Sequence, residues 1–65
     1  MKITVNGAPR ETASPNVATL VAELHLEPRM VLIEHNATAL RRSEWPESPL
    51  AEGDRIEILQ VAAGG

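Results

Sequence analysis

The apolar residues of this chain change their spacing along the sequence, and that change most constrains the fold. Alternate residues from Met1 to Val5 are apolar, which predicts a strand with one buried face. Asn6-Gly7 supplies the positive backbone dihedrals of a tight hairpin, so a return strand is expected over residues 8–12. Pro9 cannot donate a ladder hydrogen bond, which places this return strand at the edge of a sheet.

A helical spacing follows the hairpin. Pro15 breaks the strand pattern, and Asn16 is placed to cap the first turn of a helix. The next apolar residues recur at i, i+3, i+4 and i+7 and form one stripe: Val17, Leu20, Val21 and Leu24. A helix of about two turns does not persist alone in water, so the stripe is expected to pack against a sheet.

The chain then returns to strand-forming sequence. Residues 30–36 are rich in β-branched and apolar side chains and predict a third strand. A turn at Asn36-Ala37 and a short fourth strand over 38–40 are expected next. Residues 43–50 hold two prolines and the single tryptophan and are interpreted as an irregular connection.

Glu52-Gly53-Asp54 predicts a turn into a last strand over 55–61. This order of elements indicates an α+β fold, a small mixed sheet with one main helix packed on one face. A β-grasp with the first and last strands side by side satisfies the order. Residues 1–65 are expected to form a single domain with a flexible C-terminal diglycine tail over 62–65.

Size and charge exclude several classes of function. A chain of 65 residues leaves little room for an enclosed active site, and it has no cysteine for a disulfide or a thiolate metal site. The net charge of −3 argues against binding to nucleic acid or to an anionic membrane. No apolar run is long enough for a secretion signal or a membrane span, so a cytoplasmic location is expected.

The chain ends in Val61-Ala62-Ala63-Gly64-Gly65. Two glycines leave the final carboxylate with little steric cover, so this end can enter a narrow channel in another protein. The alternative interpretation is a frayed terminus without a function.

Several segments resemble the ThiS family of bacterial sulfur carriers in their order and spacing. They are Met1–Gly7, Arg42-Ser43-Glu44-Trp45, Pro49–Ile58 and Gly64-Gly65. The resemblance implies a ubiquitin-like β-grasp protein whose Gly65 is adenylated by a ThiF-type enzyme and converted to a thiocarboxylate. The sulfur, supplied by a donor such as a cysteine desulfurase, then passes to thiazole synthase, ThiG, for the thiazole of thiamin. The family often has Asn-Gly where this chain has Asn36-Ala37, and an alanine in the left-handed region costs about 1–2 kcal/mol, which favours another turn type here.

The chemistry of the tail requires a partner. A terminal carboxylate has a pKa of about 3.3–3.7 and is unreactive toward nucleophiles at neutral pH unless it is activated. The glycines are too scattered for a phosphate loop and Lys2 is the only lysine, so the chain is expected to bind no cofactor and to leave ATP to its activating partner. We therefore interpret the chain as a protein co-substrate and not an enzyme, with Gly65 bearing sulfur, Gly64 giving access and Ala62-Ala63 forming an extended spacer.

Other side chains have competing interpretations. Leu59 and Val61 lie on the opposite face of the last strand from Ile56, and either dock a partner or pack under a loop. Trp45 either anchors a partner or, as we favour, covers one end of the core. His25 is expected either to be solvated or to interact with the dipole at the C-terminal end of the helix. His35 is expected to pack at the core edge. Two histidines without further ligands are too few to predict a metal site.

Two other functions remain open at this point. A carrier of sulfur for molybdopterin or another metabolite would share the fold and the diglycine end. A ubiquitin-like modifier would join Gly65 to a lysine, or carry an inert tail.

Overall fold

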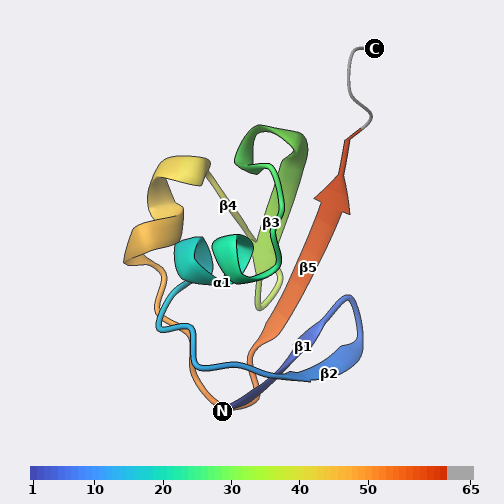
Figure 1. Ribbon diagram of the computed structural model, residues 1–65, viewed down its shortest axis with the longest axis vertical. Coiled ribbons are helices and arrows are strands. Elements are labelled where there is room, and N and C mark those ends of the chain that lie inside the picture. Colours follow the sequence, from blue (N-terminus) through green and yellow to red (C-terminus); the bar gives the residue numbers. More distant parts are fainter. Residues whose placement is uncertain (62–65) are drawn as a thin grey trace.

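The computed structural model describes residues 1–61, in which five strands form one mixed sheet and one α-helix packs on a single face (Figure 1). The strands are β1 (Lys2–Val5), β2 (Ala8–Glu11), β3 (Val31–His35), β4 (Thr38–Leu40) and β5 (Arg55–Gln60). They lie in the order β2-β1-β5-β3-β4. β1 and β5 pair in parallel and the other neighbours are antiparallel. The predicted α+β fold and the pairing of the first and last strands are therefore confirmed.

The helix α1 (Val17–Glu23) begins at the predicted cap. The Asn16 side chain accepts a hydrogen bond from the Thr19 amide at 2.9 Å, which satisfies one of the free donors of the first turn. The side chains of Val17, Leu20 and Val21 are buried against the sheet, as the apolar stripe predicts. Leu24 caps the C-terminal end, and His25 follows it, exposed and in the left-handed region with φ of 57°.

The core lies between α1 and one face of the sheet. Its buried residues come from the helix, from three strands and from the segment between β4 and β5: Ile3, Val17, Leu20, Val21, Val31, Ile33, Trp45, Leu50 and Ile56. Trp45 is only 4% exposed, so the interpretation that it covers one end of the core is confirmed. Two central strands, β1 and β5, contribute Ile3 and Ile56, and burial of these β-branched side chains fixes which face of each strand turns inward.

Some expectations about local structure were wrong. Arg42–Glu47 forms a 3-10 helix, η2, which takes up the first five residues of the segment 43–50 that was expected to be irregular. The Arg41 amide donates to the Glu44 carboxylate at 2.6 Å and the Glu44 amide donates to the Arg41 carbonyl at 2.8 Å, so the first turn is held locally. A second 3-10 helix, η1 (Pro28–Met30), takes the first residue expected of the third strand.

The turn at Asn36-Ala37 has φ of 50° and 72°, so the expectation of a turn outside the left-handed region was wrong. The register pairs His35 with Thr38 and leaves only two residues for the connection, which requires such a turn. Asn36 makes three hydrogen bonds. Its backbone amide donates to the Arg55 carbonyl at 2.8 Å, and its side-chain oxygen accepts from the Arg55 backbone amide at 2.8 Å. Its side-chain nitrogen donates to the Asp54 carboxylate at 3.1 Å. These contacts offset the strain at Ala37.

Glu23 joins the end of α1 to β2 and the following loop. Its carboxylate accepts hydrogen bonds from the Thr12 and Ser14 hydroxyls at 2.6 and 2.7 Å and from the Arg10 guanidinium at 2.7 Å. The hydroxyl bonds from Thr12 and Ser14, followed by that from Arg10, lower the pKa of Glu23 from 4.5 to about 2. A carboxylate so placed stabilises the folded chain only while it is ionised.

Replacement of Glu23 by glutamine is therefore expected to reduce the free energy of unfolding at neutral pH by about 1–2 kcal/mol. Because the pKa is lower in the folded state, wild-type stability from this group is complete above pH 4.5 and is lost as the pH falls toward 2. In urea denaturation, the free energy of unfolding should fall less between pH 7 and pH 2 for the variant than for the wild type. The control is Glu27→Gln. The Glu27 carboxylate lies 3.7 Å from the Arg29 guanidinium in an exposed ion pair, so this variant should show the wild-type dependence of the unfolding free energy on pH.

Candidate functional site

The strand β5 lies at the centre of the sheet, between β1 and β3 (Figure 1), and is the last strand before the C-terminal tail in the sequence. It pairs with β3 over five positions, from Val31 opposite Gln60 to His35 opposite Ile56. The Val61 amide then donates to the Met30 carbonyl at 2.8 Å, so the backbone is held up to the last described residue. The predicted tail residues, Ala62, Ala63, Gly64 and Gly65, lie outside the described part of the chain.

Asn6 holds β5 from the side of β1. Its side-chain oxygen accepts from the Ile58 amide at 2.6 Å, and its side-chain nitrogen donates to the Ile58 carbonyl at 3.1 Å. Its own backbone amide donates to the Ile56 carbonyl at 2.8 Å. β1 ends at Val5, and the Asn6 side chain then forms the two hydrogen bonds to the Ile58 backbone that a further residue of β1 would have formed. The pairing along β5 is thereby extended toward the tail.

Asp54 orders the start of β5. It accepts hydrogen bonds from the Ala51 amide at 2.9 Å and from Asn36 at 3.1 Å, and a ring nitrogen of His35 lies 2.7 Å from it. Burial raises the pKa of Asp54, but the bonds to His35, Asn36 and Ala51 together outweigh it and hold the pKa below its usual range. His35 is half-buried at the core edge as predicted, and its polar contact links β3 to β5.

The outer face of the sheet, opposite α1, carries large apolar side chains in the open. Leu59 is 62% exposed and Leu32, its direct neighbour in the β3–β5 register, is 60% exposed. Val61 is 41% exposed. The idea that Leu59 and Val61 pack under a loop is therefore wrong for the described chain. Partner docking stays a prediction for these two residues.

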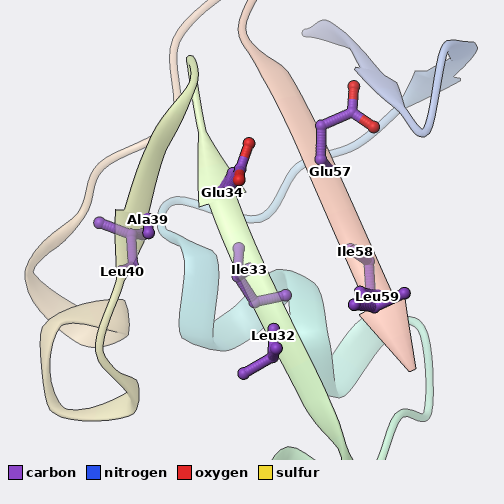
Figure 2. A pocket seen from close by; sticks show the side chains of 8 residues that line it. All are labelled: Leu32, Ile33, Glu34, Ala39, Leu40, Glu57, Ile58 and Leu59. Carbon is purple, nitrogen blue, oxygen red and sulfur yellow. The ribbon is translucent and has the colours of Figure 1, made fainter. Parts of the chain in front are cut away.

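Leu32 and Leu59 line an open groove of about 480 Å³ that lies over β3, β4 and β5 (Figure 2). Glu34 and Glu57 line the same groove, and they too are direct neighbours in the register. In Figure 2 the two leucines lie toward one end of the groove and the two carboxylates toward the other. We call these four residues the outer-face patch. The sequence interpretation identified only Leu59 of the four, because the others are recognised only once the β3–β5 register is known.

Two further features of the described chain concern other classes of site. Residues 1–61 contain no cluster of three or more histidine, aspartate or glutamate side chains that could hold a metal ion. In the same residues, no helix has the length and hydropathy that crossing a bilayer demands.

The mixed sheet with one helix on one face, and a central strand that leads into the tail, define a ubiquitin-like β-grasp domain. The sequence model of the ThiS family matches residues 3–65. The chain therefore belongs to the ThiS family. This result confirms the resemblance found in the sequence.

Solved structures and curated relatives agree with this assignment. The crystal structure of the thiamine biosynthesis protein ThiS from Geobacter metallireducens superposes with a TM-score of 0.84 at 30% identity, covering 100% of both chains. Its solution structure gives a TM-score of 0.81, covering 100% of this chain and 88% of that one. The sulfur carrier protein ThiS of Thermus thermophilus is 30% identical over 94% of this chain and 95% of its own length.

A longer relative is also similar. A thiazole synthase of Paramagnetospirillum magneticum is 33% identical over 66 aligned residues, which cover 100% of this chain. The chain spans only 20% of the length of that protein.

Proposed function

We propose that this chain is a sulfur carrier protein of thiamin biosynthesis, a co-substrate on which partner enzymes act. The observation that carries the proposal is the match to the ThiS family, which extends to Gly65. The Thermus relative, called a sulfur carrier protein, is of nearly the same length, which supports the same function here. The position of β5 adds to this support, since a backbone held up to Val61 can present the residues that follow.

The chemistry begins at the carboxylate of Gly65. A ThiF-type adenylyltransferase joins the carboxylate to the AMP portion of ATP and releases pyrophosphate. A persulfide, supplied through a donor such as a cysteine desulfurase, then attacks the acyl carbon and displaces AMP to form an acyl disulfide. A thiol, such as that of cysteine, reduces the S–S bond to leave the thiocarboxylate and is itself oxidised to a disulfide. Gly65 has no side chain to obstruct the attack, and Gly64, Ala63 and Ala62 keep the approach narrow.

The thiazole synthase of P. magneticum supports the identity of the sulfur acceptor. This chain matches one fifth of that protein over its own full length, so a domain of this kind is joined there to a larger polypeptide named for thiazole synthesis. Covalent linkage of a carrier to the enzyme it serves raises their effective concentration, which gives such a fusion a physical advantage. We therefore assign a ThiG-type thiazole synthase as the acceptor.

The test is the intact mass of the protein after incubation with ATP, the ThiF-type enzyme of the same genome, a cysteine desulfurase and cysteine. One oxygen at the C-terminus should be replaced by sulfur, and the product should then support thiazole formation by the thiazole synthase. An unchanged mass with demonstrably active partners would refute the proposal. An isopeptide conjugate in place of the thiocarboxylate would indicate a modifier.

Leu59 is proposed, with Val61, to dock on the activating enzyme. Replacement of Leu59 by lysine should weaken binding to the ThiF-type enzyme at least about 10-fold, since burying one leucine contributes about 1.5–3 kcal/mol. Calorimetric titration measures the affinity. The control Ser43→Lys adds the same charge on η2, which packs against α1, and should leave the affinity unchanged. Equal affinities for the wild type and Leu59→Lys, with both folded, would refute docking at this residue.

A further inference from the structure

In the outer-face patch, each residue of β3 lies opposite a residue of the same type on β5. Leu32 lies opposite Leu59, and Glu34 lies opposite Glu57. Side chains directly opposite each other in an antiparallel pair have Cβ atoms about 4.5–5.5 Å apart, and like charges in this position destabilise the sheet. The folded chain therefore carries two adjacent carboxylates at a cost in its own stability.

Within residues 1–61, neither carboxylate of the pair, that of Glu34 or that of Glu57, forms an ion pair with a cationic group. Arg55 lies two residues before Glu57 on the same face of β5 and forms no ion pair with either carboxylate in that part of the chain. Both glutamates are exposed, so the pair is open to a cation from outside the molecule.

We propose that Glu34 and Glu57 together receive a cationic side chain, an arginine or a lysine, of the enzyme that activates the tail, while Leu32 and Leu59 receive an adjacent apolar side chain of that enzyme. The proposal rests on the proposed function and specifies how the partner is recognised. An arginine suits the pair best, because its planar guanidinium can donate to two carboxylates at once.

The charge of the patch selects this occupant over a second copy of the chain. Two copies that met through the outer face about a twofold axis would bring together four carboxylates, two from each patch. A basic partner instead relieves the repulsion between Glu34 and Glu57 and gains in the rate of encounter with a chain of net charge −3.

The position of the patch suits an enzyme that works on the C-terminus. Gly65 is the sixth residue after Leu59, so the chain between them can span at most about 22 Å. A terminal carboxylate and a narrow tail offer few contacts, so a surface near the tail gives the activating enzyme a further means of recognising this chain. After sulfur has been added, the thiocarboxylate itself marks the chain for the acceptor.

The test uses the full chain and the ThiF-type enzyme of the same genome, with ATP–pyrophosphate exchange as the assay. The double variant Glu34→Gln/Glu57→Gln keeps the size of both side chains and removes both charges. We expect its KM to rise about 10- to 100-fold with kcat within about twofold of the wild type. Added NaCl should raise the wild-type KM and affect the variant less. Its melting temperature should equal or exceed that of the wild type, because the repulsion has been removed.

The matched control is Glu47→Gln, which removes one exposed charge from η2 on the helix side of the molecule. Its KM should equal that of the wild type. An unchanged KM in the double variant, or an equal rise in Glu47→Gln, would overturn the proposal while activation of the wild type still supports the sulfur-carrier function. A wild-type chain that the active enzyme does not adenylate would refute the proposed function, and with it this choice of partner.

Discussion

Replacement of Gly64 by valine is expected to reduce kcat/KM for thiocarboxylate formation about 100-fold. A β-branched side chain restricts the backbone just before Gly65 and widens the narrow tail, and a displacement of about 1 Å at a reacting centre can cost two orders of magnitude in rate. The measurement is the initial rate of thiocarboxylate formation by intact mass, over a range of carrier concentrations.

A graded series separates steric obstruction from unfolding. Gly64→Ala should lose less activity than Gly64→Val, in order of side-chain size. Both variants should unfold at the wild-type urea midpoint, since within residues 1–61 the last buried core residue is Ile56. Equal rates for all three proteins would show that the proposed role of Gly64 as an access residue is wrong.

Replacement of Ile56 by alanine is expected to reduce the free energy of unfolding by about 3–4 kcal/mol. The side chain is 0% exposed, and β5 packs between β1 and β3 at this position, opposite Val5 and His35. A cavity at the centre of so small a core removes a large share of a total stability of about 3–10 kcal/mol. Urea denaturation followed by far-UV circular dichroism gives the change.

Leu59→Ala is the matched control on the same strand. Because this side chain is 62% exposed, its truncation should cost less than about 1 kcal/mol. A comparable loss at both positions would contradict the assigned inner and outer faces of β5. The two variants also separate stability from recognition, because Leu59→Ala should weaken partner binding while the chain remains folded.

β5 therefore serves both the core and the outer surface. Its inward residue Ile56 fills the space under α1, whereas Glu57 and Leu59 face outward beside β3. The bonds from Asn6 to Ile58 and from Val61 to Met30 hold the same strand close to the tail. The last described residue before the tail is thus held at the end of the sheet, next to the surface by which we propose that the activating enzyme recognises the chain.

Local features were readable from the sequence. The spacing from Val17 to Leu24 and the cap at Asn16 specify α1, because helix periodicity and capping depend on residues within one or two turns. The hairpin at Asn6-Gly7 and the inward face of β5 follow from turn chemistry and the two-residue period of a strand. The 3-10 helix η2 was missed, since Ser43–Leu50 has no clear period and the burial of Trp45 against the core holds it.

The turn at Asn36-Ala37 illustrates the opposite case. Local preference argued against an alanine in the left-handed region, yet φ of 72° is observed because the β3–β4 register leaves no other connection. The contacts of Asn36 with Asp54 and Arg55, far along the chain, stabilise it. Tertiary pairing here outweighed a local cost of about 1–2 kcal/mol.

The sequence by itself determined the helix, the opening hairpin, the alternation of β5 and the glycine end, because each depends on neighbours along the chain. Only the tertiary structure decided that Asn6 reaches Ile58, 52 residues away, and that Glu34 lies opposite Glu57. Strand register between distant segments is set by packing of the shared core, through residues such as Ile33 and Ile56, and no local pattern encodes it. The residue that we propose to carry the sulfur, Gly65, could therefore be identified from the sequence, whereas the surface that we propose to select the enzyme emerged only from the sheet.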